Sequence, residues 1–381
     1  MNITGKTCLR PFTFFELQAN EAYNCCPSWI NSHAIGKYDS KSSVFALWNS
    51  EMSQKIRESM FDGSFKYCNS TLCPRLQNGE LDDISAILDG QFGEYLQKIF
   101  AKRLLIVDMP TVLNLCYDFS CNLRCPSCRS EMIFLKPKDP EFEKKEILQE
   151  QLLEFIHSTQ KDIEVSITGS GDPFASRLFL TFIKKIDLTK NPNIKLNLQT
   201  NGVLFDPKHW EEIANVHNCK VINSIISLDA SCEETYNINR VGGNWQKLLK
   251  NLEFVAELYQ KKILKHVRLD MVVQENNYTE INGFIEIARK HNFNCSLQRI
   301  TNWGTYNKNQ FLQKNIFSIK HAKHAKFLEV MRNLPQYDKL GLGNLAEFTN
   351  PINNQGFEKK GNKLVNTLRK LTYKLNLGDF R

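Results

Sequence analysis

The sequence predicts an α/β protein built around a sheet of parallel strands. Between residues 111 and 306, six short apolar segments alternate with five longer segments whose apolar residues recur at helical spacing. Strands that alternate with helices form βα units, and successive units place their strands in parallel in one sheet. The six segments also carry apolar residues on both faces, which is typical of buried parallel strands. The predicted strands lie at residues 112–119, 162–168, 193–200, 221–228, 266–273 and 293–300.

The five predicted helices complete these units. They lie at residues 143–158, 175–187, 207–217, 244–260 and 279–291. In a sheet of this kind the loops that follow the strands collect at the carboxyl edge, and ligands bind there. We therefore expect the functional residues of the repeat to lie in these loops.

Outside the repeat, cysteine content and periodicity divide the chain further. Residues 1–78 are predicted to form a small cysteine-rich domain with one amphipathic helix over Val44–Met60. Residues 79–110 read as a helical linker, residues 111–306 as the core, and residues 307–381 as a C-terminal helical tail. The basic stretch in the tail, KKGNKLVNTLRKLTYK, is typical of a solvated surface.

Composition limits the classes of function. The chain has 381 residues, of which 42% are hydrophobic and 24% are charged, and no apolar run reaches 18 residues. We therefore expect no membrane span. The net charge of +8 is spread along the chain, whereas nucleic-acid binding needs clustered charge, so we expect no nucleic-acid partner. The first residues do not resemble a secretory signal, which favours a cytoplasmic protein.

Three cysteines follow the first predicted strand. Cys121, Cys125 and Cys128 have the spacing CxxxCxxC, and three thiolates this close together can meet at one metal centre. A [4Fe–4S] cube normally takes four cysteines, so three would leave one iron open for a ligand from outside the protein. The alternative is a zinc site with Cys116 as the fourth ligand. Cys116 lies on the strand before the loop, and we therefore favour the cluster.

The motif CNLRCPSC, placed after the first strand of a βα repeat, resembles that of the radical SAM enzymes. The resemblance implies a partial (βα)6 barrel of the TIM type. It also implies a [4Fe–4S] cluster that binds S-adenosylmethionine, whose one-electron reduction yields a 5′-deoxyadenosyl radical that abstracts hydrogen from a substrate. The family commonly has an aromatic residue before the third cysteine, where this chain has Ser127.

Later loops match further motifs of the family in the same order. Gly169-Ser170-Gly171-Asp172-Pro173 is similar to the GGEP motif, with serine and aspartate in place of a glycine and the glutamate. The resemblance assigns ammonium binding to this loop, ribose contacts to the third and fourth loops, and the carboxylate of S-adenosylmethionine to an arginine. The residues so implied are Gly169, Gly171, Asp172, Thr200, Ser227 and Arg240.

The N-terminal cysteines resemble the SPASM or twitch extension of radical SAM enzymes, which carries an auxiliary [4Fe–4S] cluster. That extension normally follows the barrel, whereas here it precedes it. The resemblance implies one closed cluster, with Cys26 as a possible replacement for Cys25, and a structural zinc site is the alternative. The implied ligands are Cys8, Cys25, Cys68 and Cys73.

The sequence thus predicts a radical SAM oxidoreductase or modifying enzyme. Its expected partners are a peptide, protein or small-metabolite substrate, such as a sugar, and an external one-electron reductant such as flavodoxin or ferredoxin. The rival class is a non-catalytic protein that binds an iron–sulfur cluster or zinc, or that transfers electrons through iron–sulfur clusters. Such a carrier would not need the ligand-binding residues of the later loops, so we favour the enzyme.

Overall fold

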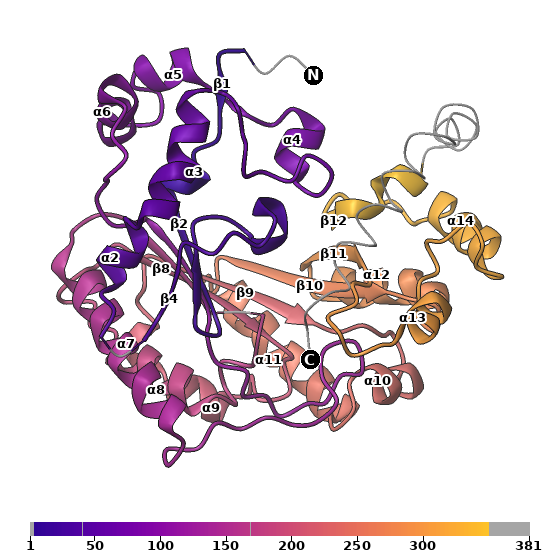
Figure 1. Ribbon diagram of the computed structural model, residues 1–381. Helices are drawn as coiled ribbons and strands as arrows, with labels where there is room; N and C mark the ends of the chain where they lie inside the picture. The colour runs from indigo at the N-terminus through magenta and orange to yellow at the C-terminus, as the bar shows by residue number, and fades with distance from the viewer. Residues whose placement is uncertain (1–3, 40, 168, 350–381) are drawn as a thin grey trace. The chain divides into compact units, whose positions relative to one another are not determined.

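The computed structural model describes residues 4–39, 41–167 and 169–349 (Figure 1). The chain divides into two compact units. The first unit comprises Met1–Arg124, Ser130–Ser227 and Gly242–Val267, and the second comprises Cys125–Arg129, Leu228–Val241 and Arg268–Arg381. In the described part of the chain, no helix is long and apolar enough to span a membrane.

Parallel strands form the centre of the first unit. Their order is β9-β8-β7-β6-β2-β3-β4, with parallel pairing from β9 to β2 and antiparallel pairing from β2 to β4. The strands are β2 (Phe14–Gln18), β3 (Glu21–Tyr23), β4 (Gly36–Lys37), β6 (Val112–Cys116), β7 (Ile163–Ile167), β8 (Ile194–Thr200) and β9 (Val221–Ser227).

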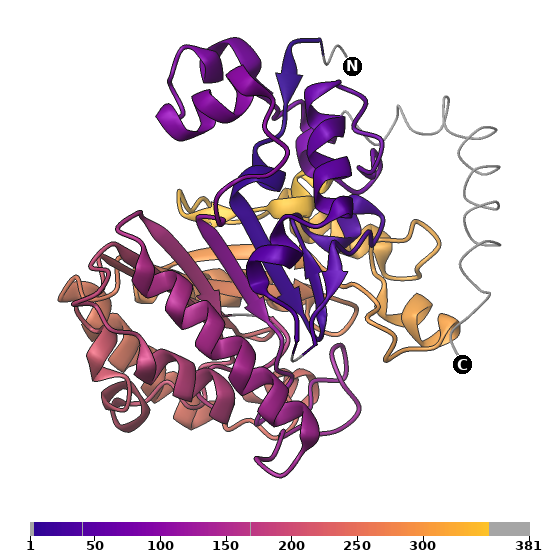
Figure 2. The same ribbon diagram turned by 60° about the vertical axis from the view of Figure 1, so that its left-hand side comes forward.

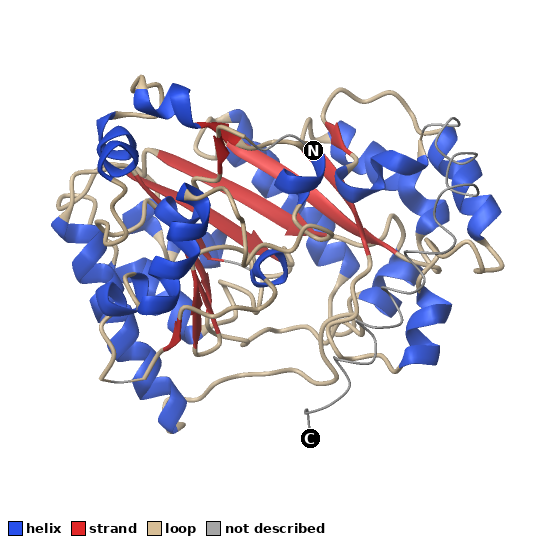
Figure 3. Ribbon diagram, turned by 45° about the horizontal axis from the view of Figure 1, so that its top comes forward, coloured by secondary structure: helices blue, strands red, loops and turns tan. Residues whose placement is uncertain are grey.

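The second unit continues the alternation of strands and helices. β11 (Asn294–Arg299) pairs in parallel with β10 (His266–Val273) and with β12 (Leu340–Gly341). All six predicted strands are therefore present, as β6 to β11, and the predicted α/β fold with parallel strands is confirmed. Figure 3 shows the helices and loops that join the strands.

The five predicted helices are present as well. α7 and α8 lie beside the strands of the first unit, as the views in Figures 1 and 2 agree. The segment 207–217 is split, because it contains a short α-helix followed by a 3₁₀ turn, and α10 was not predicted. The helices are α7 (Pro140–Ser158), α8 (Arg177–Lys185), α9 (Pro207–Glu211), η2 (Ala214–Val216), α10 (Glu233–Asn239), α11 (Trp245–Gln260) and α12 (Ile281–Lys290).

The prediction that these strands are apolar on both faces is wrong for β7 and β8, whose second face carries only polar and charged residues. One face carries fully buried aliphatic side chains such as Leu113, Val165 and Leu196. On the other face a row of polar side chains runs across five neighbouring strands, since each member lies opposite the next in register. This polar row consists of Glu16, Asn114, Ser166, Asn197 and Asn223.

Hydrogen bonds link the members of the polar row. Asn114 Nδ2 donates to Glu16 Oε2 at 2.9 Å, Asn197 Nδ2 donates to Ser166 Oγ at 3.0 Å, and Asn223 Nδ2 donates to Asn197 Oδ1 at 2.8 Å. Glu16 is buried and the other four are half-buried. One face of the first unit's sheet is therefore polar and in contact with solvent.

The N-terminal segment contributes to this sheet, because β2 pairs in parallel with β6. The helix predicted over Val44–Met60 is two helices, α2 (Val44–Trp48) and α3 (Glu51–Phe61). The break is local, since the Ser50 side chain accepts from the Ser53 backbone N–H and caps a new helix. The shorter elements are β1 (Lys6–Thr7), α1 (Arg10–Thr13), η1 (Pro27–Ile30), α4 (Pro74–Asn78), β5 (Asp82–Asp83), α5 (Ile84–Leu88) and α6 (Glu94–Lys102).

The C-terminal part of the second unit packs through aromatic side chains. Phe327 contacts Phe317 and Phe348, with ring centroids 5.2 and 5.3 Å apart. The basic stretch KKGNKLVNTLRKLTYK lies outside the described residues. The remaining elements are η3 (Tyr278–Glu280), α13 (Lys308–Lys314), α14 (His324–Arg332) and η4 (Gly343–Phe348).

Candidate functional site

Cys121 lies in the loop after β6, in the first unit. Its backbone N–H donates to the Ile133 carbonyl at 2.8 Å, which closes the loop with an antiparallel bridge. Its Sγ accepts from the Leu123 N–H at 3.5 Å and from Asn201 Nδ2 at 3.7 Å. N–H donors aimed at a buried sulfur stabilise its thiolate, which is the form that binds metal.

Cys125 and Cys128 belong to the second unit. Cys125 is buried and Cys128 is exposed, and the Cys128 N–H donates to the Cys125 carbonyl at 2.9 Å. Each sulfur lies near a guanidinium: Arg240 Nη1 is 3.6 Å from Cys125 Sγ, and Arg129 Nη2 is 3.4 Å from Cys128 Sγ. Burial raises the pKa of the Cys125 thiol, and the positive charge of Arg240 opposes this shift.

The second loop packs on the backbone of the cysteine loop. A Cβ atom at Gly171 would lie 2.5 Å from the Ser120 carbonyl oxygen and 2.7 Å from that of Asp118, so only glycine fits. The Ser170 hydroxyl donates to the Asp118 carbonyl at 2.8 Å. Gly169 has a φ of 66°, in the region that glycine adopts without strain. The two loops are thus held together by contacts that need these small residues.

The Asp172 carboxylate is fully buried and accepts hydrogen bonds from its own chain. Its Oδ2 accepts from Thr200 Oγ1 at 2.7 Å and from the Asn201 N–H at 2.8 Å, while Oδ1 accepts from the Phe174 N–H at 3.0 Å. Burial raises the pKa of Asp172, and these hydrogen bonds oppose the shift. The structure therefore uses Asp172 and Thr200, both expected at the ligand, to join the second and third loops.

Asn201 is a functional candidate that sequence reasoning missed. Besides Cys121 Sγ, its Nδ2 donates to Asn122 Oδ1 at 2.9 Å, and its Oδ1 accepts from the Val203 N–H at 3.0 Å. It thereby connects the third loop to the cysteine loop. The available signal is its position directly after Thr200, at the end of the third predicted strand.

In the second unit, Arg240 pairs with Asp229, a residue to which the sequence reading gave no role. Arg240 Nη2 lies 2.7 Å from Asp229 Oδ2, and both side chains are buried. Burial lowers the pKa of Arg240, but the negative charges of Asp229 and of ionised Cys125 and Tyr236 together outweigh it, so the net shift of the pKa is upward. Arg240 Nε is buried and has no hydrogen-bond partner among the residues that the structure describes. In the first unit, Ser227 is the half-buried last residue of β9.

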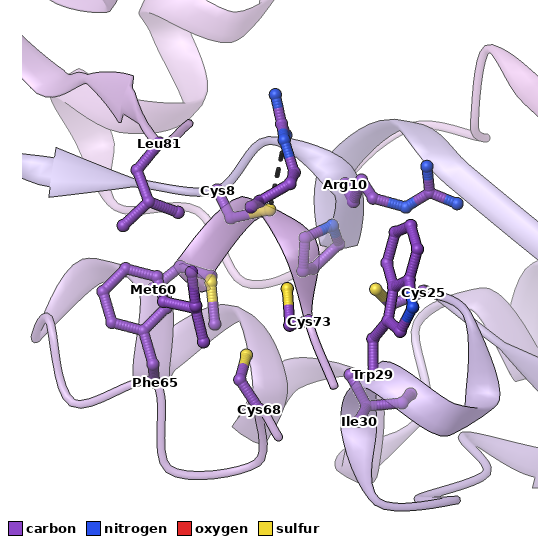
Figure 4. Close-up of a pocket in the computed structure, with 13 residues that line it drawn as sticks. Cys8, Arg10, Cys25, Trp29, Ile30, Met60, Phe65, Cys68, Cys73 and Leu81 are labelled. Carbon is purple, nitrogen blue, oxygen red and sulfur yellow. Dashed lines mark hydrogen bonds between the residues drawn. The ribbon is translucent and has the colours of Figure 1, made fainter. Parts of the chain in front are cut away.

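Four N-terminal cysteines line one cavity of the first unit (Figure 4). The cavity contains about 360 Å³ of atom-free space, part of it open to solvent. Its cysteines come from three segments, with two of them in the loop between α3 and α4, and are Cys8, Cys25, Cys68 and Cys73. Cys26 is not among the lining residues, and its Sγ lies 3.4 Å from Ser28 Oγ.

The pKa values of two of these thiols are raised by burial and by the neighbouring thiols. Burial raises the pKa of Cys68 to about 12, with smaller contributions from Cys25, Cys8 and Cys73. Burial also raises the pKa of Cys25 to about 12, against the positive charge of Arg10. Without metal the Cys25 and Cys68 thiols are therefore protonated near neutral pH, so metal binding must release their protons.

The cysteine set fits a [4Fe–4S] cluster, because four sulfur atoms surround one cavity, as Figure 4 shows. A cube places each thiolate on a different iron, so its four ligands stand further apart than those of a single ion. In the described residues, no three His, Cys, Asp or Glu side chains are arranged to hold a single metal ion.

Comparisons with known proteins bear on residues 119–288, which match the family model described as Radical SAM superfamily. No curated protein matches the chain. Among solved structures, SuiB from Streptococcus suis bound to S-adenosylmethionine is 17% identical with a TM-score of 0.43, over 79% of this chain and 64% of SuiB. The present chain thus covers less than two thirds of SuiB.

Two further solved structures are similar at the same low level. Native anSMEcpe with bound AdoMet and a Cp18Cys peptide is 18% identical with a TM-score of 0.38, over 57% of this chain and 56% of that one. TYW1 with a lysine–pyruvate adduct is 18% identical with a TM-score of 0.37, over 59% and 72%. The family assignment rests on the matched model, which begins in the loop that carries Cys121, Cys125 and Cys128. Residues 119–288 of this chain therefore form a radical SAM domain.

Proposed function

We propose that this chain cleaves S-adenosylmethionine reductively at a [4Fe–4S] cluster held by Cys121, Cys125 and Cys128, and abstracts hydrogen from its substrate. The observation that carries the proposal is the family match over residues 119–288, which contains these three cysteines. The N–H and guanidinium donors near each sulfur support it, because they favour thiolates. When bound, S-adenosylmethionine supplies a 5′-deoxyadenosyl radical after one electron arrives from an external reductant such as flavodoxin or ferredoxin.

The chain's own residues would hold S-adenosylmethionine in distinct ways. Gly169 and Gly171 let the main chain of the second loop approach the ligand ammonium. Arg240 would bind the ligand carboxylate through its buried Nε–H, while its ion pair with Asp229 fixes the guanidinium plane. Ser227 would contact the ribose.

Asp172 and Thr200 are positioning residues in this proposal. Their mutual hydrogen bond, with the one from the Asn201 N–H, fixes the second loop against the third. Asn201 in turn reaches Cys121 Sγ. A change at Asp172 would therefore alter ligand binding through the loops.

We assign a second, auxiliary [4Fe–4S] cluster to the N-terminal cavity, with Cys8, Cys25, Cys68 and Cys73 as ligands. The shared cavity supports this set, and the position of Cys25 in the cavity wall favours it over Cys26. Four cysteine ligands would close the cube. The segment would then act like the SPASM or twitch extension of related enzymes.

The substrate would be a peptide, a protein or a small polar metabolite such as a sugar. The polar row across β2, β6, β7, β8 and β9 supports a substrate rich in hydrogen-bonding groups, because a half-buried face of amides and hydroxyls binds such groups best. We place the enzyme in the cytoplasm, where thiols stay reduced, without a membrane or nucleic-acid partner.

The test is anaerobic reconstitution followed by iron analysis. The chain should bind about eight irons in two clusters, and the Cys121→Ala/Cys125→Ala/Cys128→Ala variant should retain about four. That variant should form no 5′-deoxyadenosine with dithionite and S-adenosylmethionine. A matched control replaces the isolated cysteines Cys219, Cys232 and Cys295 by alanine and should keep both the iron and the activity.

Two outcomes would contradict the proposal. Zinc in place of iron after anaerobic purification would support the structural-zinc alternative. Clusters that form without any 5′-deoxyadenosine production would support an electron-transfer protein.

A further inference from the structure

The N-terminal cavity holds two positive charges as well as four cysteines. Arg10 and Arg75 both line it. Arg75 Nη1 lies 3.6 Å from Cys8 Sγ, the contact dashed in Figure 4, and 3.4 Å from Asp82 Oδ2. Asp82 Oδ2 also accepts from the Leu9 N–H at 3.3 Å. The carboxylate thus holds the Arg75 guanidinium beside the sulfur.

Arg10 is held in the cavity wall by aromatic rings. Its guanidinium carbon lies 3.8 Å from the centroid of the Phe14 ring and 5.2 Å from that of Trp29. Its Nε is buried and finds no hydrogen-bond partner within residues 4–39, 41–167 and 169–349, although a buried unpaired donor costs about 1–3 kcal/mol. Its backbone N–H donates to Cys8 Sγ, and its charge opposes the rise in the pKa of Cys25.

The rest of the cavity wall is apolar. It consists of Pro11, Trp29, Ile30, Met60, Phe65, Leu76 and Leu81. Charges that face each other across apolar surroundings interact more strongly than charges in water. The solvent therefore screens the interaction between the guanidinium groups and the sulfur ligands less than it would at a fully exposed surface, although the Arg75 side chain is 30% exposed.

We propose that Arg10 and Arg75 raise the reduction potential of the auxiliary cluster. The inference rests on the proposed cluster in this cavity. Reduction adds one electron to a cluster that four thiolates already make negative, so nearby cations and N–H···S contacts stabilise the reduced state more than the oxidised state. Arg75 acts through Cys8, and Arg10 acts through its charge beside Cys25.

The experiment is an EPR-monitored redox titration of the full chain after anaerobic reconstitution. In the Cys121→Ala/Cys125→Ala/Cys128→Ala variant, the EPR signal comes from the auxiliary cluster alone and can be assigned. The same signal is then titrated in the chain that carries both clusters. Arg75→Gln and Arg10→Gln should each lower the equilibrium constant for reduction about tenfold, which is about 59 mV for a one-electron couple. Arg75→Lys and Arg10→Lys, which keep the charge, should recover part of the shift.

The Asp82→Asn variant distinguishes an electrostatic effect on the reduction potential from an effect of a less rigid cavity wall. It removes a negative charge while an amide oxygen can still accept from the Leu9 N–H, so the potential should rise. Lys37→Gln is the control for loss of a distant positive charge, since the Lys37 side chain is 80% exposed, and it should leave the potential unchanged.

The outcomes distinguish the inference from the proposal on which it rests. The inference would be wrong if the reduction potential were unchanged in both Arg10→Gln and Arg75→Gln. It would also be wrong if the potential fell in Asp82→Asn as well as in the arginine variants. Neither result would contradict the presence of the auxiliary cluster. If Cys68→Ala/Cys73→Ala loses no iron relative to its parent, the cluster assignment itself fails.

Discussion

Single residues show that side chains named by motif also make hydrogen bonds and ion pairs that the motif alone does not indicate. Asp172 was expected to face a ligand ammonium, yet its carboxylate is fully buried and accepts from Thr200, Asn201 and Phe174. Arg240 was expected at a ligand carboxylate, and it already pairs with Asp229. A sequence motif identifies the residue at a loop position, but its hydrogen-bond partners come from other strands and appear only in the fold.

Replacement of Asp172 tests whether its carboxylate holds the second and third loops together. Asp172→Ala leaves the Thr200 hydroxyl and the Asn201 and Phe174 N–H groups without their acceptor. Each buried unsatisfied group costs about 1–3 kcal/mol, so the free energy of unfolding should fall by about 3 kcal/mol or more in urea denaturation. Affinity for S-adenosylmethionine, measured by calorimetry on the anaerobically reconstituted enzyme, should fall about tenfold or more, with the iron retained.

The control for Asp172 is Asp39→Ala, which removes an exposed carboxylate that also accepts from a nearby backbone N–H. It should change the free energy of unfolding by about 0.5 kcal/mol or less. A stable Asp172→Ala protein with normal affinity would show that the second and third loops do not depend on this carboxylate.

At the scale of elements, periodicity predicted most of the fold. The strands β6 to β11 and the helices α7, α8, α11 and α12 were predicted within a few residues, because their apolar spacing reflects burial directly. The break between α2 and α3 was missed, since it depends on one cap at Ser50. The polar row was missed because its members come from different strands, and only the register of the sheet places them side by side.

The N-terminus of α9 offers an element-scale prediction with a pH signature. Asp206 caps this helix, accepting from the His209 N–H at 3.0 Å, and it lies 3.1 Å from Lys247 Nζ. Although partial burial acts in the opposite direction, hydrogen bonds from His209 and Lys247 lower the pKa of Asp206 to about 2. A folded pKa below the unfolded value of about 4 contributes stability above that value, which is lost as the pH falls toward 2.

Two variants separate the cap from the charge. Asp206→Ala should lower the free energy of unfolding by about 1 kcal/mol near neutral pH, because the cap is lost. Asp206→Asn keeps a capping oxygen, so its difference from the unmodified protein should shrink between about pH 4 and 2. Urea denaturation across this range checks both, and a pH-independent difference for Asp206→Asn would rule out the ionised carboxylate as the cause.

At the scale of the whole molecule, the sequence identified the candidate cysteine ligands but not the side chains that surround them in the fold. Thiol spacing is a local property, so Cys121, Cys125 and Cys128 could be singled out from one loop. The N-terminal four are spread over 66 positions of sequence and were grouped by resemblance. The cations beside them, Arg10 and Arg75, carried no sequence signal, because each becomes relevant only when the chain folds around the cavity.

The two proposed clusters should be separable in function. Cys68→Ala/Cys73→Ala removes two of the four proposed auxiliary ligands and leaves the loop of Cys121, Cys125 and Cys128 intact. The variant should lose about half of the iron, yet still form 5′-deoxyadenosine from S-adenosylmethionine with dithionite. Turnover of the natural substrate should fail, because the lost auxiliary cluster would transfer electrons during turnover or stabilise the fold of the N-terminal segment.

Spectroscopy of the auxiliary cluster decides between a closed and an open cube. With Cys8, Cys25, Cys68 and Cys73 as ligands, every iron is already bound to a thiolate and none is free for a substrate. The EPR spectrum of the auxiliary cluster should therefore show no change in iron coordination when substrate is added. Cys25→Ala is the matching single change: with Cys26 outside the cavity wall, it should lose the auxiliary cluster. Retention of that cluster in Cys25→Ala would mean that Cys26 moves in to replace Cys25.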